Sequence, residues 1–253
     1  MSVRRTTLTP TRTRPTEPAR AAASGTHEVP QLMRLLHLAS PALPIGAFHF
    51  SQGLEYAVEV GWVKDEAGAL EWIGGIAAGS FATLDLPVLQ RLHAAWVRDD
   101  GADVRRWNSF LIANRETAEL RAEDRHLGGA LLRVLAELGL EPEIARTDVK
   151  NLPSGVAHAT SFAFACARWN IDAVAMSQTY AWGWVENQVL AAIKLVPLGQ
   201  SAGQRMLHAL NVRLSALVLR SVEVMDSDIG VSTAIAAVAS GRHETQYTRL
   251  FRS

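Results

Sequence analysis

The sequence predicts an all-α fold, a single domain of roughly eight to ten packed helices. Apolar residues recur at helical spacing from about Pro30 onward, and the period-2 alternation that marks strands is absent. The links between the periodic segments are short, and no internal repeat at a solenoid period is visible. A chain of 253 residues that is 48% hydrophobic and 20% charged can bury the core that such a domain needs.

Caps and apolar stripes place the helices of the first part of the domain. Asp65 is expected to cap a helix over residues 66–79, and Asp85 to cap the next one, within residues 83–97. A helix over residues 30–39 comes before both, with these residues on one stripe: Leu32, Leu35, Leu36 and Ala39.

Two further helices are predicted over residues 104–115 and 117–139. Gly139 is expected to end the second, because glycine favours the backbone conformation that terminates helices. Residues 140–151 form a connector, after which Pro153 is expected to open a helix of small residues. The core stripe of the 117–139 helix consists of Leu120, Leu127, Leu131, Leu135 and Leu138.

The second half contains two long helices and a short one. Asp172 is expected to cap the helix over residues 173–196, which Pro197 stops. A second long helix covers residues 201–224, and an apolar helix near residues 232–241 precedes the tail. Three aromatic residues of the first long helix do not share a face, so some must meet another helix or a partner: Tyr180, Trp182 and Trp184.

Composition excludes several classes of function. A net charge of zero gives no global field toward nucleic acid or an acidic membrane, and neither is an expected partner. The single cysteine, Cys166, cannot form an internal disulfide, and the apolar runs are shorter than the ~20 residues of a membrane span. Residues 1–28 are rich in arginine, threonine and proline, and we expect a disordered basic extension outside the domain of residues 29–253.

No local motif carries catalytic chemistry. The eight histidines form no HxH or HxxxH pair, and neither GxxxxGK[ST] nor GxSxG occurs. The glycines of "GGIAAG" (residues 74–79) sit in a helical pattern, where close packing accounts for them. We expect no catalytic residue, no metal site and no cofactor.

Three segments, in order along the chain, resemble one family. "LLHLASPALPIGAFHFSQGLEYAVEVGWV" (residues 35–63) resembles the N-terminal signature of the urease accessory protein UreF family. "AAIKLVPLGQSAGQRML" (residues 191–207) is similar to a later stretch of that family, and "TRLFRS" at the end looks like its tail. The resemblance runs from about Leu32 to Ser253.

The resemblance implies an all-α, dimeric, cytoplasmic protein that catalyses nothing. Its members bridge UreD (also called UreH) and the GTPase UreG, and the assembly docks on apo-urease and delivers nickel to it. Modulation of GTP hydrolysis by UreG is a further expectation. The residues expected to bind partners are Pro44, Gly46, Phe48, His49, Phe50, Ser51, Gln52, Gly53, Lys194, Gln200, Gln204, Tyr247, Arg249, Leu250, Phe251 and Arg252.

The prolines and glycines of residues 40–53 are expected to fix a rigid irregular segment that presents Phe48, His49 and Phe50. A loop whose aromatic residues merely cover the core is the alternative. The apolar end of the chain should dock, either on its own domain or in an interface. Because Phe48 replaces the tyrosine of some family members, a cation–π contact with Arg249 is expected in place of a hydroxyl contact.

Two classes of function remain open. A scaffold predicts shallow apolar patches and no deep cleft. An enzyme predicts a deep pocket lined by titratable groups with shifted pKa values, assembled from distant residues. The candidates for such a site are Glu223, Asp226, Asp228 and His208.

Overall fold

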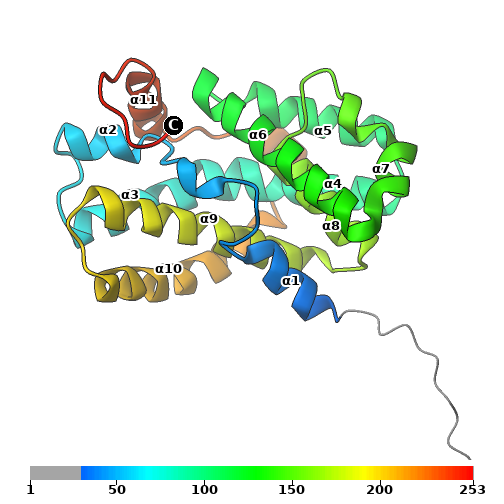
Figure 1. Cartoon of the computed structure of the whole chain (residues 1–253), viewed down its shortest axis with the longest axis horizontal. Helices are drawn as coiled ribbons and strands as arrows, with labels where there is room; N and C mark the ends of the chain where they lie inside the picture. Colours follow the sequence, from blue (N-terminus) through cyan, green and yellow to red (C-terminus); the bar gives the residue numbers. More distant parts are fainter. Residues whose placement is uncertain (1–29, 253) are drawn as a thin grey trace, which may run out of the picture.

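The computed structural model describes residues 30–252 and confirms the all-α fold, since no strand occurs in that range (Figure 1). Helices α2 and α7 have only six and seven residues, so nine longer helices form the domain over residues 30–252. The predicted extension, residues 1–28, lies outside the described residues. The helices are α1 Gln31–Ala39, α2 Leu54–Glu59, α3 Glu66–Ile76, α4 Leu86–Val97, α5 Gly101–Ala113, α6 Ala118–Leu135, α7 Glu141–Thr147, α8 His158–Arg168, α9 Ala173–Leu195, α10 Gln200–Ser221 and α11 Ala234–His243.

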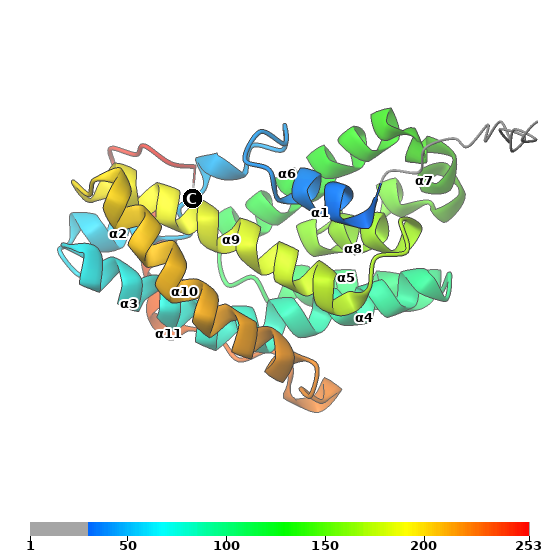
Figure 2. The same cartoon turned by 90° about the horizontal axis from the view of Figure 1, so that it is seen from below.

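Helix α9 is the centre of the packing. It lies along α10, and it also contacts α1, α3 and α4 (Figures 1 and 2). Helices α4, α5, α6 and α8 pack on one another in the right half of Figure 1, whereas α11 packs on α2 at the other end. The end of the chain returns to the start of α2 and so meets the segment between α1 and α2.

Two predicted caps are confirmed and one is wrong. Asp65 accepts a hydrogen bond from the Gly68 N–H, and Asp172 accepts from the second and third N–H groups of α9. Asp85 does not cap α4, because α3 and α4 are joined by a wide π-type segment, Ala77–Asp85, kinked at Gly79. The Asp85 side chain therefore turns inward and pairs with Arg115.

Other sequence predictions fail where tertiary packing decides. Only part of the stripe predicted for residues 30–39 faces the core: Leu35 packs against it, but Leu32 and Leu36 are 64% and 56% exposed, and Leu38 is buried. Leu138 is also exposed, although Gly139 does end the helix with a φ of 96°. Pro153 lies in a turn, and α8 begins only at His158.

The helical run Glu66–Val97 is long and apolar enough to cross a membrane by length and composition alone. Within residues 30–252 it is the one such run, and 67% of its most apolar window is buried inside the domain. That burial is typical of a core helix, and its apolar residues already have protein neighbours.

Candidate partner-binding surface

Residues 40–53, which we call the strut, form an irregular connection between α1 and α2. Gly46, Gln52 and Gly53 all have positive φ angles, of 78°, 53° and 84°. A Cβ atom on Gly53 would lie 2.7 Å from the Ser240 backbone nitrogen, so only glycine lets α11 pack here. Together with the two prolines, these positions fix the strut in one shape.

The strut presents two of its three aromatic side chains. Phe48 is 46% exposed, and its ring contacts the exposed His49 imidazole with centroids 3.9 Å apart. Phe50 is buried, so the prediction that it is presented is wrong. Its ring faces His126 of α6, at a centroid distance of 5.9 Å, because the 3₁₀ turn Ala47–His49 directs Phe50 to the opposite side.

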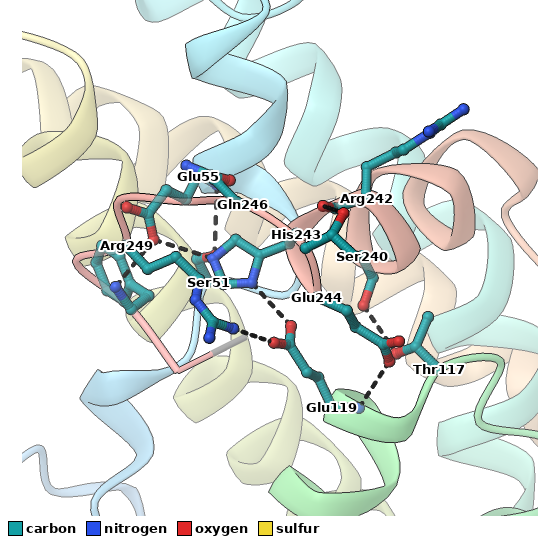
Figure 3. Close-up of polar contacts among 12 residues, drawn as sticks. Ser51, Glu55, Thr117, Glu119, Ser240, Arg242, His243, Glu244, Gln246 and Arg249 are labelled. Atoms are coloured by element: carbon teal, nitrogen blue, oxygen red, sulfur yellow. Dashed lines mark hydrogen bonds and ion pairs between the residues drawn. The ribbon is translucent and has the colours of Figure 1, made fainter.

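The end of the chain, residues 244–252, docks on this strut, and we call it the tail (Figure 3). The buried Glu55 carboxylate accepts hydrogen bonds from the backbone N–H groups of Leu250 (2.6 Å) and Phe251 (2.9 Å). The Arg252 N–H donates to the His49 carbonyl oxygen at 2.8 Å, and the Phe251 side chain is buried. Of the two alternatives that the sequence leaves open, the tail thus docks on its own domain in this structure.

His243, the last residue of α11, is fully buried between two carboxylates (Figure 3). Its Nε2 lies 3.1 Å from Glu55 Oε2, and its Nδ1 lies 2.8 Å from Glu119 Oε2. Each ring nitrogen faces a carboxylate oxygen, so the imidazole connects α2 to α6 through two polar contacts. The Arg249 guanidinium completes the group with a 2.7 Å contact to Glu119, and we call Glu55, Glu119, His243 and Arg249 the tail cluster.

The tail cluster also joins separate helices. Glu55 belongs to α2, Glu119 to α6 and His243 to α11, so the cluster ties three helices to the tail. A hydrogen bond of 2.8 Å between the Thr117 and Ser240 hydroxyls links α6 to α11 beside it. Removal of the Glu55 carboxylate would leave buried donors of the tail and of His243 without a partner.

The predicted cation–π contact between Phe48 and Arg249 is wrong, because Arg249 is bound to Glu119. The cation near the Phe48 ring is Lys194, from the end of α9, with Nζ 5.8 Å from the ring centroid. The same Nζ lies 5.6 Å from the centroid of Phe251. Lys194 thus connects the strut to the tail.

The structure brings most of the residues expected to bind partners together on the strut and the tail, but not all to the surface. Phe48, Tyr247 and Leu250 are the apolar side chains that stay exposed, Tyr247 and Leu250 at 103% and 68%. Gln200 and Gln204 are exposed in the first turns of α10, and within residues 30–252 no hydrogen bond joins either to the strut or the tail. The other exposed members are Pro44, His49, Lys194, Arg249 and Arg252, and the buried ones are Phe50, Ser51, Gly53 and Phe251.

A cavity of about 130 Å³ lies behind the strut, between α1, α6, α9 and α11. Gln52 lines it, accepting from Trp184 Nε1 at 2.9 Å and donating to Glu123 at 2.8 Å. The expectation of shallow patches without a deep cleft is therefore wrong. The candidates for an enzyme site do not line this cavity, since Glu223, Asp226, Asp228 and His208 are all exposed elsewhere.

The ionisable groups of the cavity stabilise one another. Arg115 lies between Asp85 and Asp124, with Nε 2.6 Å from Asp124. Burial lowers the pKa of His158 to about 4, so its ring is neutral at pH 7, and burial raises the pKa of Tyr180 far above its ordinary value. Tyr180 and Trp184 stack on Phe81, so those two predicted aromatic residues meet a helical segment of the same chain.

Cys166, the one cysteine of the chain, is buried away from this cavity. Burial raises the pKa of the Cys166 thiol, which makes it unreactive. Among the described residues, no group of three or more histidine, cysteine, aspartate or glutamate side chains could hold a metal ion. The charged group of the cavity is one arginine shared by two carboxylates, and His158 Nε2 and Gln188 Oε1 on its lining have no hydrogen-bond partner among the described residues.

The residues that order the tail escaped the sequence analysis. Glu55, Glu119 and His243 are nearly 190 residues apart at most, and no local pattern links them. Glu55 lies within residues 35–63, the segment that resembles the family signature, and this position was the one available signal. Its role could be recognised only once the tail was seen on it.

The fold and this surface define a class: an all-α protein whose tail docks on its strut. The two segments form one surface, which we call the composite face. The UreF family model matches residues 63–211. The chain is 48% identical over 226 residues to the urease accessory protein UreF of Azoarcus sp., covering 88% of this chain and 95% of that protein. It is 47% identical over 222 residues to the protein of that name from Alkalilimnicola ehrlichii, covering 87% and 95%. The chain belongs to the UreF family of urease accessory proteins.

Proposed function

We propose that this chain acts in urease maturation as a non-catalytic scaffold that bridges UreD/UreH and the GTPase UreG. In this proposal the assembly docks on apo-urease in the cytoplasm, for nickel insertion, with this chain as a homodimer. The carrying observation is the composite face, where backbone hydrogen bonds from Leu250 and Phe251 to Glu55 fix the tail, and Lys194 lies near the rings of both Phe48 and Phe251. Phe48, Leu250 and Tyr247 stay exposed on these fixed segments. Exposed aromatic and apolar anchors on a fixed backbone are typical of protein-binding surfaces.

The proposal includes an effect on GTP hydrolysis by positioning UreG. The contacts of Arg249 and Arg205 argue against direct insertion of either side chain into the nucleotide site of UreG. Arg249 is bound to Glu119, and Arg205 forms two hydrogen bonds with Glu66. Either guanidinium would have to leave a carboxylate before it could reach a nucleotide.

The test uses a host that makes urease but lacks this chain. Genes for the wild-type chain, Phe48→Ala and Trp62→Ala are returned, and urease activity and urease-bound nickel are measured. Phe48 and Trp62 are both 46% exposed, so the second variant is a matched control at another surface. We expect Phe48→Ala to lower both readouts at least about tenfold, the effect of losing one hot-spot anchor. Trp62→Ala should leave them unchanged. Full urease activity without the chain would refute the proposal.

A further inference from the structure

The composite face is surrounded by positive charge. Lys194 lies beside Phe48 and Phe251, Arg252 lies on the strut, and Arg133 lies on the α6 surface that carries His126. Within residues 30–252 none of the three cations forms a salt bridge, whereas Arg249 nearby is paired with Glu119. This excess is local, because residues 30–252 contain more acidic than basic side chains.

The pKa of His126 responds to the same positive charges. Burial, together with the positive charges of Arg252, Arg133 and His49, lowers the pKa of its imidazole. The side chains of His126 and His49 both approach Gly46, with ring nitrogens 3.3 and 3.4 Å from the position a Cβ atom would take there. The strut, α6 and the tail therefore bring cationic or titratable groups to one place.

The carboxylates near this place already have partners. Glu123 accepts from Gln52 of the strut, Glu55 holds the tail and His243, and Glu119 contacts His243 and Arg249. They cannot also neutralise Lys194 or Arg252 at the surface. The face thus combines an exposed phenylalanine, an exposed leucine and unpaired cations, and its electrostatic complement is negative.

We infer that this face binds an acidic segment of a partner protein, with carboxylates near Lys194, Arg133 and Arg252 and an apolar side chain against Phe48 and Leu250. The inference rests on the proposed function and names the chemistry of the partner surface. A protein is favoured over a nucleic acid because a DNA-binding protein commonly contacts several phosphates, roughly 6–10, whereas this face has three full cations. Three full cations around apolar anchors match the polar rim and apolar centre of a protein interface.

The first experiment needs no natural partner. The full chain is titrated by NMR with the peptide Glu-Glu-Leu-Glu-Glu, and the pKa of His126 is followed. Carboxylates docked beside Arg252 and Arg133 should raise that pKa by about 0.5 unit or more. The peptide Gln-Gln-Leu-Gln-Gln should leave it unchanged.

Charge reversal makes the experiment site-specific. Lys194→Glu and Arg252→Glu should each weaken binding of the acidic peptide at least fivefold. Arg213→Glu, on the exposed face of α10, should leave it within twofold. Equal binding by all variants, or no response of His126 at millimolar peptide, would overturn the inference. So would tighter binding of a twenty-nucleotide thymidine strand or of phosphatidylserine vesicles than of the peptide.

A second readout separates this inference from the proposed function. Binding of purified cognate UreG and of UreD/UreH is measured in 50 mM and 300 mM salt. The inference expects one of them to bind at least tenfold more weakly to Lys194→Glu, and more weakly at high salt. If UreG or UreD/UreH binds tightly, and neither salt nor either charge reversal changes the affinity, the inference of an acidic segment is refuted while the proposed function stands. A wild-type chain that binds the peptide but neither protein refutes the proposed function alone.

Discussion

Glu55 is the residue on which the ordering of the tail depends. Its two carboxylate oxygens accept from the Leu250 N–H, the Phe251 N–H and His243 Nε2, all within 3.1 Å. A buried carboxylate with several donors is costly to remove, because each donor would lose its partner away from water. Glu55 lies in the segment that resembles the family signature, but the tail residues that it binds come about 190 residues later, so no local pattern indicates its role.

We expect Glu55→Ala to lower the free energy of unfolding by about 2–4 kcal/mol, because it leaves the buried polar groups of Leu250, Phe251 and His243 without their partner. It should also release the tail, seen as faster hydrogen exchange at Leu250 and Phe251. Glu59→Ala, at an exposed position of the same helix, is the control and should change stability by less than about 0.5 kcal/mol. Urea unfolding measures both, and equal stabilities would contradict the role of Glu55.

His158 should make stability depend on pH. Its pKa is about 4 in the folded chain against an ordinary 6.5, because its ring is buried. Between these values the unfolded chain binds a proton that the folded chain does not, so lowering the pH from 6.5 to 4 favours unfolding. His158→Asn should show a shallower loss of stability over that range, by close to one proton per molecule. His208→Asn, at an exposed position, should follow the wild type, and an unchanged slope in His158→Asn would rule the effect out.

The strut and α11 fit because of glycine. Gly53 has a φ of 84°, and a Cβ there would meet the backbone of α11. Gly53→Ala should therefore destabilise the domain by more than about 1 kcal/mol and loosen α11. Gly75→Ala is the matched control, because nothing lies within 4 Å of its Cβ position inside α3, and it should be neutral or stabilising by up to about 1 kcal/mol. Thermal unfolding compares them, and equal effects would argue against close packing at Gly53.

Helices could be predicted because their signal is local. The stripes and the caps at Asp65 and Asp172 depend on residues within a few turns. The cap predicted at Asp85 is wrong because the chain stays helical through a π-type segment, which no short sequence pattern indicates. The exposure of Leu32 and Leu36 could not be predicted either, because a stripe gives a face but not what covers it.

For the whole molecule, the sequence predicted the surface better than the interior. A docking tail and an exposed Phe48 followed from apolar residues in unusual places. The cavity and its Asp85–Arg115–Asp124 group did not, because those residues come from three separate segments. The ion pairs that join Arg115 to Asp85 and Asp124 fit a structural role, and the exposed composite face fits a scaffold.

A GTPase assay distinguishes positioning from insertion of an arginine. If this chain positions UreG, Arg249→Ala should alter the hydrolysis rate of saturated UreG by less than about tenfold. Loss of an inserted arginine would lower it by about 10³ or more. Arg252→Ala, measured in parallel, tests the other tail arginine, and a thousandfold loss in either variant would contradict positioning.

Direct binding of UreG and UreD/UreH to the purified chain is the decisive measurement. Wild type, Phe48→Ala, Leu250→Ala and Trp62→Ala are compared at one salt concentration, with helix content checked by circular dichroism. We expect Phe48→Ala and Leu250→Ala each to weaken binding of at least one partner tenfold or more, while Trp62→Ala and the helix content stay unchanged. Equal affinity of all four proteins for both partners would show that the strut and tail do not form the binding surface.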